Sequence, residues 1–131
     1  MIIFDTCALI FDALNPQKLT RPTKKAIESA EAKKQLYCCD ISLWEIAMLI
    51  QKKRLDPHTD TQTFLQLILQ ARQIQVLSIT LEIATLSASY AGFKHYDPAD
   101  RLIAATTMHH HATLVTSDQH LQKLPDLTTI W

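Results

Sequence analysis

Glycine is nearly absent from this sequence of 131 residues, in which Gly92 is the only one. A glycine-rich phosphate-binding loop needs several glycines at close positions, and so does the G-x-G-x-x-G fingerprint of dinucleotide-binding folds. Nucleotide-cofactor enzymes of these two kinds are therefore excluded. The glycine-flanked nucleophile elbow of serine hydrolases is absent for the same reason.

The sequence also lacks a charge excess and any long hydrophobic run. The 13 Lys and Arg residues balance 13 Asp and Glu residues, which argues against a protein that holds nucleic acid by bulk positive charge. Binding of phosphate through metal ions stays compatible with this balance. No apolar run reaches the roughly 20 residues of a membrane span, and the N-terminal MIIFDTCALIF has no basic leader. We therefore expect a cytoplasmic protein with no membrane-bound part.

Cysteine is scarce, since Cys7, Cys38 and Cys39 are the only three. An odd count without framework spacing does not predict disulfides. All three lie in apolar segments, so we expect buried free thiols and not redox or zinc-binding groups. The length is typical of one domain, residues 1–131.

Short β-rich segments alternate along the chain with longer amphipathic ones, a pattern that predicts a parallel sheet covered by helices. The expected strands are 2–5, 36–40, 75–79 and 112–117, with a fifth at an edge at 127–131. The expected helices are 6–13, 23–34, 41–55, 60–73, 80–93 and 98–110. A loop is expected at 15–22, and Gly92 is expected near the end of the 80–93 helix.

Four acidic residues fall at equivalent places in this pattern. Asp5 and Asp118 close the first and fourth strands, while Glu45 and Asp100 lie in the first turns of helices. In an open α/β sheet, the carboxyl ends of strands and the amino ends of helices gather at one edge, where such folds bind ligands. We therefore expect the four carboxylates to converge.

Structural explanations exist for three of these acids taken singly. Glu45 would complete a capping box with Ser42, Asp100 would complement a helix dipole, and Asp118 would cap a following turn. Asp5 fits such an explanation least, because a carboxylate after an apolar central strand costs several kcal/mol to desolvate unless it is paired. No Lys or Arg stands out in the sequence as its partner.

Four converging carboxylates repel one another, so their grouping favours a site for divalent cations. An all-oxygen site suits Mg²⁺ or Mn²⁺, whereas Zn²⁺ calls for His or Cys ligands. Ions of this kind can bind a phosphodiester and activate a water for its hydrolysis. The tract of His109, His110 and His111 is a weaker candidate, because successive helical positions point about 100° apart.

The segment HYDPADRLIAAT carries two acids on either side of Pro98. Asp97 stands where a helix cap belongs, and we expect its carboxylate to accept hydrogen bonds from the N–H groups of the first turn. Asp100, three residues on, lies on the same side of that turn and is expected to face the crevice.

Four motifs in this order, IIFDTCALI, ISLWEIAML, DPADRLIAAT and TLVTSD, together resemble those of the PIN-domain ribonucleases, and in particular VapC-type toxins of prokaryotic toxin–antitoxin pairs. No one motif is specific alone, and DPADRLIAAT is the strongest. The resemblance extends from Ile2 to the terminal TTIW. One departure is Ala99, where typical relatives carry a bulky residue.

The resemblance implies a three-layer α/β/α sandwich with a central, mainly parallel sheet of 4–5 strands. It places Mg²⁺ or Mn²⁺ at Asp5, Glu45, Asp100 and Asp118, which would carry the catalysis as well. It implies cleavage of single-stranded regions of RNA, for instance in tRNA or rRNA, a frequent homodimer, and a cognate antitoxin protein whose C-terminal segment covers the site.

Two further expectations concern partners. Arg101, next to Asp100, is the first candidate to contact RNA phosphates, and other basic candidates are Lys52, Lys53, Arg54 and Lys94. The 60–73 segment has more apolar residues than one buried helix face requires, so it either lines a groove for a protein partner or is buried core.

The main alternative is a catalytically silent PIN-like module that binds RNA or protein. A phosphatase with Asp5 as nucleophile would want a second acid two residues on, where Cys7 stands. A receiver-type signalling domain would want adjacent acids after the first strand and a lysine after a late one. Thr6 and the VTSD strand end match neither requirement.

Overall fold

The computed structural model describes residues 1–131 and contains one five-stranded sheet in the order β3-β2-β1-β4-β5. All neighbouring strands run parallel, which confirms the predicted parallel sheet. The strands are β1 (Ile2–Phe4), β2 (Leu36–Cys39), β3 (Gln75–Leu77), β4 (Thr113–Val115) and β5 (Thr129–Ile130).

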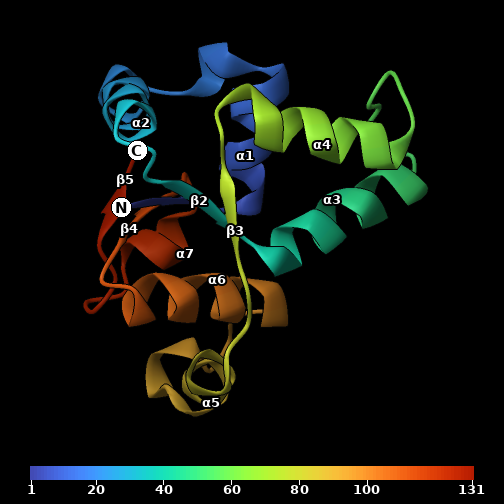
Figure 1. Cartoon of the computed structure of the whole chain (residues 1–131). Coiled ribbons are helices and arrows are strands. Elements are labelled where there is room, and N and C mark those ends of the chain that lie inside the picture. The colour runs from blue at the N-terminus through green and yellow to red at the C-terminus, as the bar shows by residue number, and fades with distance from the viewer.

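Helices cover both faces of the sheet. They are α1 (Thr6–Leu14), α2 (Arg21–Ala32), α3 (Asp40–Gln51), α4 (Thr61–Ala71), α5 (Leu81–Ser89), α6 (Pro98–His109) and α7 (Gln119–Gln122). Figure 1 shows α1, α2 and α4 on one side of the sheet and α5 and α6 on the other. The predicted three-layer α/β/α sandwich is therefore confirmed. None of the helices combines the length and the hydrophobicity that a membrane span requires.

The two halves of the core follow from the alternation of side chains along a strand. In β1, Phe4 belongs to the buried cluster with α1, α2 and α4, while Ile3 belongs to the cluster with α5 and α6. The same alternation places Cys38 in the first cluster and Cys39 in the second. Strands that are buried on both faces need apolar residues at every position, which explains their unbroken hydrophobic runs.

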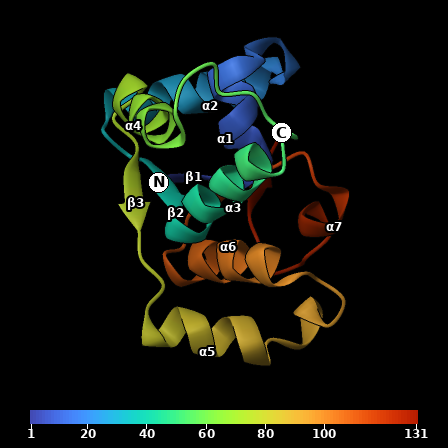
Figure 2. The same ribbon diagram turned by 90° about the vertical axis from the view of Figure 1, so that its right-hand side faces the viewer.

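The order of the strands creates a crevice beside β1. From β1 the chain passes to β2 on one side. From β4, which pairs with β1 on the other side, it passes outward to β5. Connections that diverge from neighbouring strands leave an opening at their carboxyl ends, where α/β folds bind ligands. Asp5 directly follows β1, and α3 lies between the two helical layers beside this opening (Figure 2).

Several element boundaries differ from the predicted ones. Helix α3 begins at Asp40 and ends at Gln51, so Glu45 lies in its second turn and not in its first. Helix α5 ends at Ser89, and Gly92 lies in a short 3₁₀ helix (Ala91–Phe93). A second one (Pro16–Lys18) and the start of α2 at Arg21 occupy most of the predicted 15–22 loop.

The cysteine prediction was right for two residues. Cys38 and Cys39 are buried free thiols in the sheet, whereas Cys7 is exposed. Position 7 lies in the first turn of α1, which opens toward the crevice and not into the core. None of the three forms a disulfide.

Candidate active site

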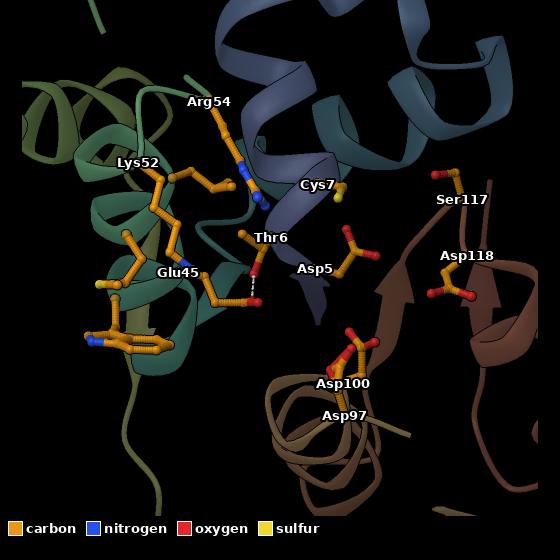
Figure 3. A pocket seen from close by; sticks show the side chains of 13 residues that line it. Asp5, Thr6, Cys7, Glu45, Lys52, Arg54, Asp97, Asp100, Ser117 and Asp118 are labelled. Carbon is orange, nitrogen blue, oxygen red and sulfur yellow. Dashed lines mark hydrogen bonds between the residues drawn. The ribbon is translucent and has the colours of Figure 1, made fainter. Parts of the chain in front are cut away.

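A pocket of about 550 Å³ opens at the carboxyl end of the sheet. Its lining includes all four acids that the sequence singled out, Asp5, Glu45, Asp100 and Asp118 (Figure 3). They come from the β1–α1 junction, from α3, from the start of α6 and from the segment between β4 and α7. The structure thus brings together residues that are up to 113 positions apart, counting from Asp5 to Asp118.

Asp5 has two structural relationships at once. Its Oδ1 accepts a hydrogen bond of 2.7 Å from the backbone N–H of Ala8 and so caps α1. The residue is only 6% exposed. Burial raises the pKa of its carboxyl group, with smaller contributions from Asp118 and Glu45, and this increase is partly offset by Thr116 and the Ala8 N–H.

Asp118 resembles Asp5 in this respect. Its Oδ1 accepts a hydrogen bond of 2.8 Å from the backbone N–H of His120. Asp118 therefore caps α7, as expected for an acid before a turn. Its own N–H donates to Oγ1 of Thr116 at 3.0 Å. Capping and facing the pocket are compatible, because a carboxylate has two oxygens.

Glu45 is held by the hydroxyl group of Thr6 and not by a helix cap. Ser42 and Glu45 do not form the capping box, because α3 begins at Asp40 and its N-cap residue, Cys39, makes no side-chain cap. Instead, the hydroxyl group of Thr6 donates to Oε1 of Glu45, and the oxygens of Thr6 and Ser42 lie 2.9 Å apart. Since an ionised carboxylate only accepts, the buried Ser42 hydroxyl donates to Thr6.

The prediction for Asp97 was wrong. It is the N-cap residue of α6 by backbone position, but its side chain makes no cap hydrogen bond and lines the pocket instead. Pro98 at the first helical position already fixes a helical backbone, so the helix begins without a capping side chain. Asp97 is thereby a fifth carboxylate beside Asp100 (Figure 3).

Asp100 is the acid whose electrostatics are most perturbed. Burial raises its pKa to about 7, and repulsion by Asp97, Asp118, Glu45 and Asp5 adds to the increase. All four neighbours contribute because their carboxylates lie close enough to disfavour the charged form of Asp100. No Lys, Arg or His forms a salt bridge with any of these five acids.

Comparison with known proteins identifies the fold that carries this pocket. The family model described as "PIN domain" matches residues 2–127. The chain belongs to the PIN domain family. This result confirms the resemblance found in the motifs.

Relatives of this PIN domain include Ribonuclease VapC22 of Mycobacterium tuberculosis, which is 30% identical over 132 residues, spanning 99% of this chain and 98% of the relative. Among solved structures, VapBC2 from Rickettsia felis, bound to a promoter DNA fragment, matches with a TM-score of 0.76 at 17% identity, over 99% and 98% of the two chains. DNA-bound VapBC from Salmonella typhimurium matches with a TM-score of 0.72 at 15% identity, over 98% and 96%. These structural likenesses show the fold.

The acids of this PIN domain fit Mg²⁺ or Mn²⁺ by their chemistry. None of these carboxylates forms a salt bridge, and no His lines the pocket. Carboxylate oxygens without His ligands suit a hard cation and not Zn²⁺. No group of three or more His, Cys, Asp or Glu side chains is arranged to hold a metal ion, the histidine tract included. Mg²⁺ usually takes only one or two carboxylates and keeps several waters, so a closed protein cage is not required.

Cys7 also lines the pocket of the PIN domain. Partial burial and the surrounding carboxylates, Asp5 and Glu45 foremost, raise the pKa of its thiol to about 11. The thiol is therefore protonated at neutral pH, whereas nucleophilic attack and metal ligation need the thiolate. The raised pKa disfavours the thiolate form of Cys7 in the metal-free protein, and the other candidate metal donors of the pocket are oxygens.

The predicted phosphate-binding residue Arg101 does not line the pocket. Its guanidinium donates to the carbonyl oxygens of Tyr96 at 2.9 Å and Lys94 at 3.1 Å, and so holds the segment before α6. The basic residues that do line the pocket are Lys52 and Arg54. The sequence named both as candidates but ranked Arg101 first, because Arg101 neighbours Asp100.

The Thr6 hydroxyl gives a first testable prediction. Thr6→Val should weaken Mn²⁺ binding about tenfold, because it removes the group that orients Glu45. It should also lower the free energy of unfolding by about 1–3 kcal/mol, since the Ser42 hydroxyl stays buried without a partner.

Thr6→Ser is the matched control and should restore both properties. The measurements are calorimetric Mn²⁺ titration and denaturant unfolding. Equal Mn²⁺ affinity in the Val and Ser variants would show that Glu45 does not depend on this hydrogen bond.

Proposed function

We propose that this PIN domain is a metal-dependent endoribonuclease that cleaves single-stranded regions of RNA. The observation that carries the proposal is the pocket, in which Asp5, Glu45, Asp100 and Asp118 meet without a cationic partner in the protein. A relative over nearly the whole chain bears the name ribonuclease, which supports the same function.

In this proposal, one or two of the four carboxylates would bind Mg²⁺ or Mn²⁺ directly and the others would hold its waters, since no three of them are arranged as direct ligands. The ion would supply Lewis-acid activation of the phosphodiester and of a water. Asp5 and Asp118 are fixed by their backbone caps, and Glu45 is fixed by Thr6. These fixed positions keep the donors in place before substrate binds, which lowers the reorganisation needed in the reaction. The raised pKa of the Cys7 thiol disfavours it as a nucleophile, and in this proposal a water is the attacking group.

The direct test is cleavage of a labelled single-stranded RNA of mixed sequence by the purified protein. We expect products with Mg²⁺ or Mn²⁺, none in EDTA, and much slower cleavage of the same strand in a duplex. Calorimetry with Mn²⁺ separates the alternatives. Mn²⁺ binding without cleavage of any RNA would contradict the nuclease, and a failure to bind Mn²⁺ would favour the catalytically silent module.

We also propose that the protein is the toxin of a toxin–antitoxin pair. Solved neighbours of the fold are described as VapBC complexes and, from Klebsiella pneumoniae, as a toxin–antitoxin complex. A second hollow of about 500 Å³ beside α4 supports a protein partner. It is lined by Phe64, Leu67 and Ile68, and Leu67 is 54% exposed, so the predicted 60–73 helix is only partly buried in the core.

Co-expression with the product of a short neighbouring gene tests this partner. The antitoxin should co-purify with the PIN domain and block its RNA cleavage. A co-purified protein that leaves cleavage unchanged would contradict the antitoxin assignment. We further propose that the protein forms a homodimer, which light scattering tests. We propose a structured RNA such as tRNA or rRNA as its target, which cleavage assays on the purified RNAs test.

A further inference from the structure

One face of α3 carries side chains that the acidic site does not use. Trp44, Met48 and Lys52 are spaced four residues apart, so they lie on the same side of the helix. All three line the pocket, as does Arg54 just beyond the end of the helix. This row begins next to Glu45 and therefore adjoins the proposed cleavage site.

Lys52 and Arg54 are exposed cations without an internal partner. The salt bridges of the protein involve only His58 and Arg72 as cations, so neither Lys52 nor Arg54 is paired with a carboxylate. Figure 3 shows both extending from the α3 side of the pocket, with Asp118 on the opposite side. In a chain of zero net charge, such a local pair of cations is what can hold phosphate groups beside an acidic site.

Trp44 is the large aromatic residue of this pocket. It is 59% exposed, and its ring packs against no other aromatic ring or cation. An exposed indole in a pocket that is also lined by carboxylates and cations offers a flat surface to a ligand that has both phosphates and rings. Stacking of an unpaired base on an aromatic side chain contributes about 1–3 kcal/mol and needs no particular base.

We propose that Trp44, Lys52 and Arg54 form the RNA-binding wall of the pocket. Trp44 stacks on an unpaired base next to the cleaved bond, and Lys52 and Arg54 hold the phosphates of adjacent nucleotides. The inference rests on the proposed ribonuclease function and deepens it, because a base in a duplex is already stacked and cannot reach the indole. The wall thus selects single-stranded RNA.

Tryptophan fluorescence tests the stacking directly, since the chain has only Trp44 and Trp131. Trp131 is half-buried near Phe11, with ring centroids 6.2 Å apart, and serves as the internal control. Trp131→Phe leaves Trp44 as the reporter, and Trp44→Phe leaves Trp131. Both proteins also carry Asp5→Asn to prevent cleavage and are titrated in Mg²⁺ with a 12-nucleotide single-stranded RNA or its duplex.

We expect the single strand to quench Trp44 strongly and the duplex to quench it little, with Trp131 unchanged in both titrations. Equal quenching by strand and duplex, or no quenching during binding, would overturn the stacking. A change in Trp44 fluorescence with protein concentration alone would instead place this residue in a contact between two copies of the chain.

Three lysine and arginine variants test the phosphate contacts. Lys53 is the matched control, because it has the same charge but a left-handed backbone (φ 59°) and lines a separate hollow with Asp56 and Pro57. Lys52→Gln and Arg54→Gln should each weaken binding of the single strand 3- to 10-fold. Each should also reduce the slope of log K against log salt by about 0.7, the value for one phosphate of a single strand.

Lys53→Gln should leave affinity and slope unchanged, and an equal loss in all three variants would overturn the assignment. Cleavage by proteins with Asp5 intact separates this inference from the function on which it rests. If the wild type cleaves RNA but the Lys52 and Arg54 variants bind the single strand as tightly as Lys53→Gln does, the proposed RNA-binding wall is wrong. If the wild type cleaves no RNA, the proposed function itself fails.

Discussion

Asp5→Asn is expected to reduce RNA cleavage by at least about 100-fold while the protein stays folded. Loss of groups that merely support a metal ligand costs 10- to 100-fold, so loss of a ligand should cost more. Asn is nearly isosteric with Asp and also caps helices well, so the hydrogen bond from Ala8 to position 5 is kept. The measurement is the single-turnover cleavage rate in Mg²⁺ and in Mn²⁺.

The same substitution should leave the metal-free protein as stable as the wild type or more so. Asp5 is buried next to Asp118 and Glu45, and these surroundings disfavour its charge, as its raised pKa shows. Removing the charge therefore relieves repulsion. Thermal unfolding in EDTA measures this effect. A large fall in melting temperature, together with unchanged cleavage, would assign Asp5 a structural role only.

Asp100→Asn is expected to have the second large effect, again a loss of cleavage of at least about 100-fold. Its effect on stability should depend on pH. The pKa of Asp100 is about 7 in the folded protein and 3.8 when unperturbed, so the folded state binds more protons between these values. The contribution of Asp100 to the free energy of unfolding of the metal-free wild type therefore falls as the pH rises from about 4 to about 7.

The variant lacks this titration. At pH 8 in EDTA, it should exceed the wild type in unfolding free energy by on the order of 1–2 kcal/mol, a value reduced for the partial exposure of the group. At pH 4 the two proteins should be nearly equal. Denaturant unfolding of both proteins across this range is the measurement. A difference between them that does not grow from pH 4 to pH 8 would show that the Asp100 carboxylate is not destabilised by burial and by its neighbours.

Asp97→Asn is the matched control for Asp100→Asn, since both remove one carboxylate from the same turn. Asp97 is exposed and repels Asp100, so its removal should lower the pKa of Asp100 and keep cleavage within about tenfold of the wild type. If Asp97→Asn abolished cleavage and Asp100→Asn did not, the essential acid of the DPAD segment would be Asp97.

The sequence by itself determined the fold class and the grouping of the acids. Unbroken apolar runs such as IIF can be satisfied only by a strand that is buried on both faces, which implies a parallel sheet under two helical layers. Because the period of the pattern locates each strand end, it also predicted that Asp5, Glu45, Asp100 and Asp118 would meet at one edge. Both results depend on local periodicity, which neighbouring residues specify.

Only the tertiary structure decided how each side chain is used. The side chain of Asp97 does not cap α6, because Pro98 begins the helix without a capping hydrogen bond. Glu45 accepts a hydrogen bond from Thr6, 39 positions away. Arg101 turns to backbone carbonyls, while Lys52 and Arg54 face the pocket. These contacts depend on which groups from distant parts of the chain lie within hydrogen-bond distance once the layers pack. A local sequence pattern does not contain that information.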